Sequence, residues 1–172
     1  MADIGLAGVP RPSPPRRGEE AFAEDVDARL GNYVKQAEQA LIAAKSDALR
    51  PFDLTVAQYA AMMALYYSPG QSSAQLSRVA AVTPQTMTTV LSRLEHKRLI
   101  VRVPSKTHRK VLVTSLTPAG EALLLRADEH ARAIEQRLAE AFTAEEHATA
   151  RDLLRRITTT LRSEPTHSAP PE

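Results

Sequence analysis

The stretch from Val82 to Arg102, VTPQTMTTVLSRLEHKRLIVR, decides the fold. Its apolar residues recur at steps of three and four, which predicts an amphipathic helix. Thr83 is a suitable N-cap for that helix, and Pro84 stands at the first helical position, where no backbone N–H is needed. The expected buried stripe consists of Met87, Val90, Leu91 and Leu94. The opposite side carries Thr, Gln and Arg, although Thr is a mediocre helix former.

A shorter helix is expected just before this stretch. Ser72 and Gln75 form a capping box, Leu76 and Val79 supply an inward face, and the pattern stops near Ala81. Two short helices joined by a tight turn, the second of them amphipathic, are typical of a helix-turn-helix. The sequence therefore predicts that the second helix, over residues 84–97, is a recognition helix.

Two β-branched runs follow the second helix. LIVRV at 99–103 and KVLVTSL at 110–116 flank the basic, turn-like segment PSKTHR. Such a pattern predicts a β-hairpin attached to the helix-turn-helix, which is a wing. The fold class predicted is therefore mainly α with a small β-wing, a winged helix-turn-helix.

Long helices are expected on both sides of this unit. Val26, Leu30, Tyr33, Ala37, Leu41 and Ala44 form one stripe of a first helix, and capping signals at Thr55, Thr117 and Thr143 begin three others. The outer stripes exceed what a small core needs, so they suggest a homodimer. The expected organisation is an N-terminal arm at 1–20, a dimerisation helix at 21–50, the DNA-binding domain at 51–116, C-terminal dimerisation helices at 117–162 and a tail at 163–172.

Composition excludes several classes of protein. The chain of 172 residues has no Cys, which rules out disulfides and Cys-based zinc sites, and no cofactor or metal site is predicted. It has no apolar run long enough to cross a membrane and no signal-peptide pattern at its N-terminus, so a cytoplasmic protein without a membrane partner is expected.

The positive charge is concentrated in one segment. Residues 72–113 carry eight basic residues and one acidic residue, a net charge of +7, whereas the rest of the chain carries 14 basic and 19 acidic residues, a net charge of −5. A segment of this kind attracts a polyanion, of which nucleic acid is the obvious example. The alternative is a basic surface that only faces solvent.

The residues expected to contact double-stranded DNA fall into three groups. On the recognition helix, facing the major groove, they are Thr83, Pro84, Gln85, Thr86, Thr88, Thr89, Ser92 and Arg93. On the wing they are Lys106, His108, Arg109 and Lys110, with Arg109 placed to enter a minor groove. Contacts to the DNA backbone are expected from Ser72, Ser73, Arg78 and Lys97. A dimer would bind a pseudo-palindrome with half-sites about one helical turn apart.

The segment from Leu54 to Leu125 resembles the multiple antibiotic resistance regulator (MarR) family. The motifs that carry the resemblance are LTVAQYAAMMAL, SSAQLSRVAAVTPQTMTTVLSRLEHKRLIVRVPS and RKVLVTSLTPAGEALL, and with the flanking helices it covers about residues 25–162. The resemblance implies a winged-helix homodimer that represses transcription and is released by a small aromatic effector. Tyr33, Tyr59, Met63 and Tyr66 would line the effector site, although Tyr and Met at helical spacing more often belong to a core.

The chain departs from the family pattern at two positions. His108 stands where the family usually has Asp, just before the wing Arg, and Arg98 stands where it usually has Gly after the recognition helix. A left-handed residue at the helix end costs about 1 kcal/mol when it is not Gly. The helix is therefore expected to end in a different way.

Two other functions remain alternatives. The winged helix could be a protein-interaction module without sequence-specific DNA binding, but such a surface should carry exposed aromatic or Met anchors, and this one carries Thr, Gln, Ser and Arg. An enzyme would need a recognisable catalytic motif, and no spacing in the chain provides one.

Overall fold

The computed structural model describes residues 18–105 and 111–163. The chain divides into two compact units, one ending at Ser46 and the other beginning at Asp47. The elements, in order, are α1 (Glu19–Asp27), α2 (Leu30–Leu49), the 3₁₀ helix η1 (Arg50–Phe52), α3 (Val56–Tyr67), β1 (Gln71–Ser72), α4 (Ser73–Val79), α5 (Pro84–His96), β2 (Ile100–Pro104), β3 (Leu112–Leu116), α6 (Pro118–Glu140) and α7 (Ala144–Arg162). The mainly helical fold with a small β-wing is therefore confirmed.

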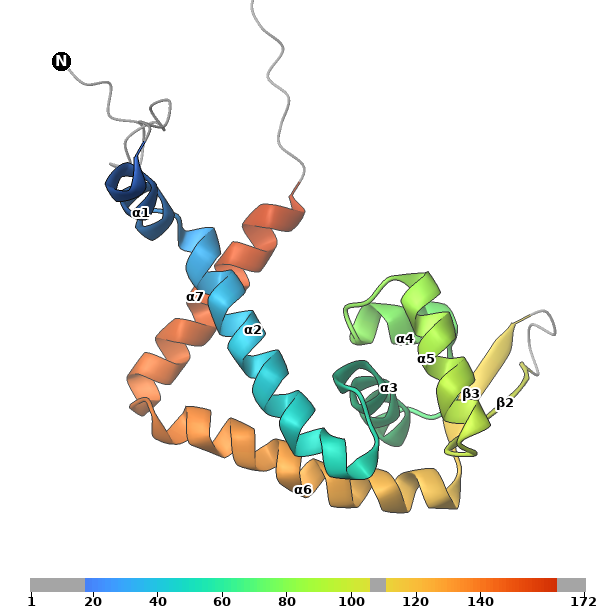
Figure 1. Ribbon diagram of the computed structural model, residues 1–172. Helices are drawn as coiled ribbons and strands as arrows, with labels where there is room; N and C mark the ends of the chain where they lie inside the picture. The colour runs from blue at the N-terminus through green and yellow to red at the C-terminus, as the bar shows by residue number, and fades with distance from the viewer. Residues whose placement is uncertain (1–17, 106–110, 164–172) are drawn as a thin grey trace, which may run out of the picture. The chain divides into compact units, whose positions relative to one another are not determined.

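The second unit is a winged helix-turn-helix extended by two long helices. Figure 1 shows α3, α4 and α5 gathered beside the β2–β3 hairpin, with α6 running along α3. The hairpin is antiparallel, with Ile100 paired to Leu116 and Pro104 paired to Leu112. The core between these elements is formed by Leu49, Leu54, Met62, Leu65, Leu76, Met87, Leu91, Leu94, Ile100 and Leu124.

Each of the predicted helix starts after residue 50 is present. Thr55 and Gln58, Ser72 and Gln75, and Thr143 and Glu146 form complete capping boxes. Thr83 and Thr117 cap α5 and α6 through their hydroxyls, and a Pro occupies the first turn of each helix. Because such caps satisfy N–H groups that have no partner inside the helix, local sequence is sufficient to fix these boundaries.

The structure differs from the expectation at several points. Val79, expected to face inward with Leu76, is exposed at the end of α4. The long N-terminal helix is divided at Ala28 and Arg29, where the Asn32 side-chain amide donates to the Val26 carbonyl (2.8 Å) and closes the end of α1. The sheet also has a third strand, since Gln71 pairs with Thr114 and Ser72 with Val113. The strand β1 is only two residues long, so it leaves no period-two pattern in the sequence.

Helix α5 ends in a left-handed residue in spite of its sequence. Arg98 has φ 59°, the Leu99 N–H donates to the Leu94 carbonyl (3.0 Å) and the Arg98 N–H donates to the Glu95 carbonyl (2.9 Å). These are the two hydrogen bonds of a Schellman motif, in which Gly is the usual left-handed residue. The expectation that Arg98 would make the helix end in another way is therefore wrong. Asp53 and Ala81 have similar φ values after η1 and α4.

We expect Arg98→Gly to stabilise the protein by about 1 kcal/mol, because Gly adopts the left-handed conformation without the steric penalty of a Cβ. Urea denaturation followed by circular dichroism measures the change. The control is Arg98→Ala, which removes the same charge but keeps the Cβ. An equal gain in both variants would assign the effect to the charge and contradict the backbone explanation.

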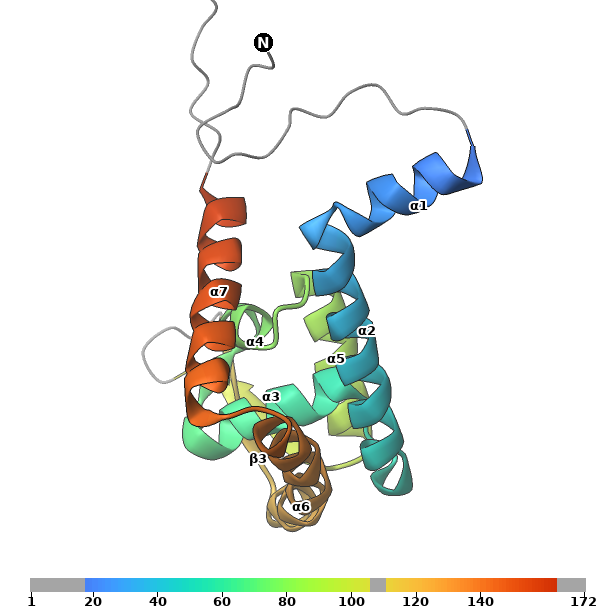
Figure 2. The ribbon, with the colours of Figure 1, turned by 90° about the vertical axis from the view of Figure 1, so that its left-hand side faces the viewer.

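Helix α6 changes character along its length. Its buried residues are Gly120, Leu124, Ala127, Asp128 and Ala131, all in the first two thirds of the helix. Beyond them Leu138 is exposed, as is Phe142 after the helix, and none of the described residues of α7 is buried. Figure 2 shows α7 as a straight helix that follows the end of α6. Within the described parts of the chain, no helix is both long enough and apolar enough to cross a membrane.

Candidate nucleic-acid interface

Helix α5 has one buried side and one exposed side. Met87, Val90, Leu91 and Leu94 are buried in the core, as the sequence predicted. The residues predicted to contact DNA on this helix, Thr83, Pro84, Gln85, Thr86, Thr88, Thr89, Ser92 and Arg93, are all exposed. The first turn of α5 has no acidic residue. The structure therefore brings this predicted set together on a single polar surface.

The hydroxyls of the four Thr residues on this surface are engaged within the helix. Thr83 accepts from the Thr86 N–H (3.1 Å), and the two hydroxyls lie 2.8 Å apart. Thr88 donates to the Pro84 carbonyl (3.0 Å) and Thr89 to the Gln85 carbonyl (3.3 Å). Among the described residues, none forms a hydrogen bond or ion pair with the side chain of Gln85, Ser92 or Arg93. The last three side chains are therefore available to an external partner.

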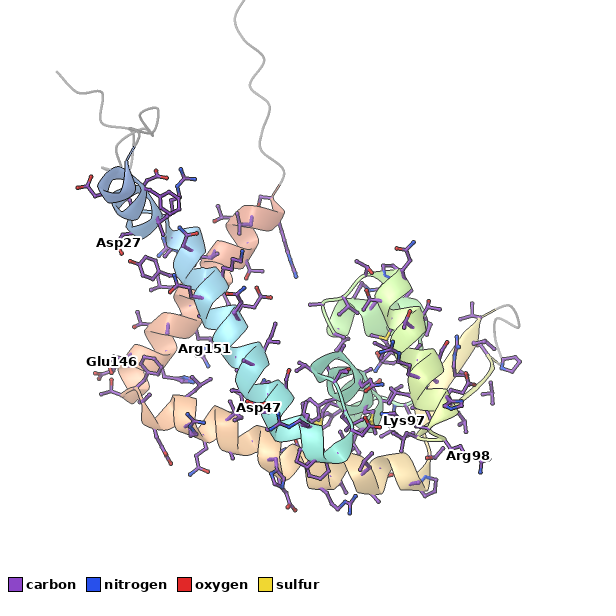
Figure 3. The ribbon with its side chains drawn as sticks, viewed as in Figure 1. Asp27, Asp47, Lys97, Arg98, Glu146 and Arg151 are labelled. Atoms are coloured by element: carbon purple, nitrogen blue, oxygen red, sulfur yellow. The ribbon has the colours of Figure 1, made fainter. Side chains whose placement is uncertain are left out.

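The residues predicted to contact the DNA backbone are placed differently from one another. Arg78 is exposed on α4, whereas Ser72 and Ser73 are half-buried at the start of that helix. Lys97 and Arg98 lie at the C-terminal end of α5 (Figure 3). The Lys97 ammonium forms an ion pair with the Asp53 carboxylate (2.8 Å) and also donates to the Asp53 carbonyl. Lys97 thus has a partner inside the protein, which the sequence did not indicate.

The wing is held to α5 by a residue that the sequence analysis counted only as charge. Arg102 on β2 is paired with Glu95 on α5 (3.7 Å), and its side chain is largely buried. The alternation along β2 was the available signal, because it places Arg102 on the same side as the buried Ile100. The predicted wing residues Lys106, His108, Arg109 and Lys110 lie outside the described residues.

The predicted effector residues are divided between the two units. Tyr33 is on α2, where its hydroxyl donates to Asp27, and Tyr59, Met63 and Tyr66 share one side of α3. Met63 and Tyr59 are half-buried and pack against the core, and Tyr66 contacts the ring of Tyr67 edge to face.

Tyr59 belongs to a polar network that the sequence analysis missed. Its hydroxyl donates to Asp128 on α6 (2.6 Å), and the Arg132 Nε donates to the other carboxylate oxygen (2.5 Å). Burial opposes ionisation of Asp128, but the hydrogen bonds from Tyr59 and Arg132 outweigh it, so the pKa of Asp128 is lowered. Burial and the hydrogen bond to Asp128 raise the pKa of Tyr59. The network ties α3 to α6 as a charged, hydrogen-bonded contact.

We expect Tyr59→Phe to lower the free energy of unfolding by about 2 kcal/mol at pH 7, because a hydrogen bond to a buried carboxylate is lost. The stabilisation depends on ionised Asp128, whose folded-state pKa is lowered. It is therefore present above the unfolded-state pKa of about 3.9 and is lost as pH falls through the folded-state value. Urea denaturation at several pH values should give a difference between wild type and variant that shrinks in acid.

The control for this substitution is Tyr66→Phe, since Tyr66 is exposed on the same helix. It should cost little at any pH. A deficit in Tyr59→Phe that is independent of pH would contradict the role assigned to the Asp128 carboxylate.

The sequence of this chain is similar to known transcription regulators, both in the winged unit and over most of the chain. A sequence model of the MarR family matches residues 52–110. The transcriptional repressor Rv2887 of Mycobacterium tuberculosis is 36% identical over 131 residues, which are 76% of this chain and 94% of that protein.

Two solved structures are similar to the fold. The complex of Rv2887 with p-aminosalicylic acid has a TM-score of 0.60 at 35% identity, covering 76% of this chain and 98% of that one. A mutant of MarR from Escherichia coli, solved in complex with operator DNA, has a TM-score of 0.70 at 25% identity, covering 79% and 96% of the two chains.

Proposed function

The chain belongs to the MarR family of DNA-binding transcription regulators, and we propose that it is a homodimeric repressor of a pseudo-palindromic operator. In this proposal α5 enters the major groove and the 104–110 wing enters the adjacent minor groove. The observation that carries it is the exposed polar side of α5, on which the side chains of Gln85, Ser92 and Arg93 have no partner among the described residues.

The chemistry of this side of α5 suits base recognition. The guanidinium of Arg93 can donate two hydrogen bonds to guanine, and the amide of Gln85 can pair with adenine. Both lie on a helix whose other side is fixed in the core, so the backbone that carries them is rigid. A protein-binding surface would instead be expected to carry large apolar anchors, which this side of α5 lacks.

Exposed apolar side chains support the dimer. On α7 they include Leu153, Leu154 and Leu161, and the end of α6 adds Leu138 and Phe142. In the N-terminal unit, Phe22, Leu30 and Ile42 are also exposed. Monomeric proteins rarely leave so much apolar surface in solvent, whereas oligomer interfaces bury it. We assign these helices to contacts with a second copy of the chain.

A small aromatic effector is the remaining part of the proposal. Rv2887 has been solved with p-aminosalicylic acid and with salicylic acid. We propose that an aromatic carboxylate of this class binds near Tyr33, Tyr59, Met63 or Tyr66 and weakens DNA binding. Isothermal titration of salicylate into the protein, with and without bound DNA, tests the coupling, since an effector that releases DNA must bind the free protein more tightly.

The experiment that tests the proposed function is selection of bound sequences from a random double-stranded DNA pool at one stated salt concentration. We expect an enriched pseudo-palindrome with half-sites about one helical turn apart. Binding that depends on salt but not on sequence would reject a sequence-specific repressor. No binding at all would favour the protein-interaction module.

We further expect Arg93→Ala to weaken binding to the selected sequence by about 1–3 kcal/mol and to relax specificity at one base position. Fluorescence anisotropy with duplexes that differ at single positions measures both effects. Arg126→Ala removes the same side chain from the exposed surface of α6 and serves as the control. A uniform loss on every sequence would reassign Arg93 to a phosphate contact.

A further inference from the structure

Thr88 and Thr89, two neighbouring exposed residues half-way along α5, have no hydroxyl proton to give to DNA. Thr88 donates to the Pro84 carbonyl (3.0 Å) and Thr89 to the Gln85 carbonyl (3.3 Å). A hydroxyl carries one proton, so neither side chain can also donate to guanine N7 or O6, adenine N7 or thymine O4 while these bonds persist. What remains to meet a base is a γ-methyl group and the oxygen lone pairs.

Both Thr residues lie on the surface of α5 that a partner would contact. At about 100° per residue, Gln85, Thr89 and Ser92 lie opposite the buried stripe centred on Leu94 and Met87, and Thr88 and Arg93 lie on the two flanks of that exposed surface. Both Thr side chains are exposed. The exposed surface of α5 thus carries two γ-methyl groups beside the amide of Gln85 and the guanidinium of Arg93, neither of which has a side-chain partner among the described residues.

Thymine is the base that presents a matching group. Its C5-methyl projects into the major groove, where apolar contact distinguishes it from the other bases. We propose that Thr88 and Thr89 recognise thymine through its 5-methyl group and not through hydrogen bonds. The inference deepens the proposed function, on which it rests, because it names the base and the atom that the centre of the recognition helix contacts.

The other Thr pair on α5 has different chemistry. The hydroxyls of Thr83 and Thr86 are 2.8 Å apart, so one donates to the other and one proton of the pair stays free. That free donor lies at the N-terminus of α5, where backbone N–H groups also favour an anion. Thr83 and Thr86 are therefore suited to contact a phosphate. Of the four Thr residues, only Thr88 and Thr89 are restricted to an apolar or accepting role.

The test is a pair of selections with the full chain, one from a random duplex pool made with thymine and one from a pool in which deoxyuridine replaces thymine. Deoxyuridine keeps every hydrogen-bonding atom and lacks only the methyl group. We expect thymine positions that are enriched in the first pool to lose their enrichment in the second. Equal enrichment in both pools would overturn the methyl inference and leave sequence-specific binding intact. No enrichment in either pool would overturn the proposed function and the inference with it.

Variants of the two residues then separate the methyl from the hydroxyl. For wild type, we expect replacement of one contacted thymine by deoxyuridine to weaken binding about four-fold, the effect of one buried methyl group. The Thr88→Ser, Thr89→Ser double variant should lose this ratio, because Ser keeps the hydroxyl without the methyl. The Thr88→Val, Thr89→Val double variant should retain it, because Val keeps the methyl without the hydroxyl.

The matched control is Thr159→Ser. Thr159 is exposed on α7 and makes the same hydrogen bond, to the Arg155 carbonyl four residues earlier (3.0 Å). Its substitution should leave the thymine-to-deoxyuridine ratio at the wild-type value. The opposite pattern, with the ratio lost in the Val double variant and kept in the Ser double variant, would show that the hydroxyl oxygens accept from a base and would overturn the proposal.

Discussion

Gly120→Ala should destabilise the protein by about 3 kcal/mol or more, because the added methyl group would overlap a backbone atom that cannot move aside. A Cβ built on Gly120 lies 2.0 Å from the Leu99 carbonyl oxygen and 2.9 Å from its carbon. That carbonyl is also the acceptor for the Thr117 N–H (3.0 Å). To relieve the overlap, the start of α6 would have to separate from the end of α5.

The contact between Gly120 and Leu99 lies where α6 is joined to the helix-turn-helix and the wing. The Thr117 hydroxyl donates to the Arg98 carbonyl (2.8 Å) and accepts from the Gly120 N–H (3.0 Å), so α6, the end of α5 and the start of β2 meet at one point. Thermal unfolding should report a midpoint lower by about 10 °C, and DNA binding should weaken as the wing loses its fixed position.

The control is Gly31→Ala. Gly31 lies inside α2, and apart from its chain neighbours and the backbone of its own helix, none of the described residues places an atom within 4 Å of its Cβ position. The same substitution there should be neutral or stabilising by about 0.5–1 kcal/mol, because Ala is the better helix former. A midpoint for Gly120→Ala within about 2 °C of wild type, less than 1 kcal/mol of change, would contradict the steric explanation.

Gly120 also illustrates what the sequence could not provide. Inside a helix that begins at Pro118, a Gly is simply an unfavourable residue. Gly is required at this position because the backbone of Leu99 lies against it, and Leu99 is distant in sequence and approaches only in the folded chain. The Tyr59–Asp128 hydrogen bond joins residues 69 positions apart, so it could not be predicted from the sequence either.

The parts of the fold that were predicted well depend on local chemistry. The capping boxes at Thr55, Ser72 and Thr143 join residues three positions apart, and the buried stripe of α5 follows one helical period. The exposure of the residues proposed to contact DNA on α5 was predicted for the same reason, since the residues that are not buried on a helix are known once its stripe is known.

The errors arose where a local signal was absent or was overruled. The apolar stripe of the N-terminal helix continues through Ala28 and Arg29, so periodicity gave no sign of the division between α1 and α2. At Arg98 the usual Gly signal is missing, but Leu99 is buried in the core and its N–H bonds to Leu94, and these interactions hold Arg98 in the left-handed conformation. Tertiary packing outweighed a penalty of about 1 kcal/mol there.

In the proposed homodimer, Leu154→Glu should separate the two copies and weaken binding to the selected duplex about 100-fold or more, because a dimer gains its second half-site contact at a high effective concentration. Leu153, Leu154, Ile157 and Leu161 form one stripe of α7, and Leu154 is 53% exposed in the single chain. A carboxylate at this position would have to be buried without a partner if the stripe packs against a second copy. Light scattering during gel filtration measures the mass, and fluorescence anisotropy with the selected duplex measures the affinity.

The matched control is Thr159→Glu, which introduces the same charge on the same helix. At about 100° per residue, Thr159 points away from the apolar stripe, and it is exposed. It should leave both the mass and the affinity close to the wild-type values. If both variants form dimers equally well, the α7 stripe is not part of the dimer interface. The interface would then be assigned to the exposed residues of the N-terminal unit. A monomeric Leu154→Glu that still binds the full duplex with wild-type affinity would contradict the two-half-site mechanism itself, because one recognition helix would then supply all of the binding energy.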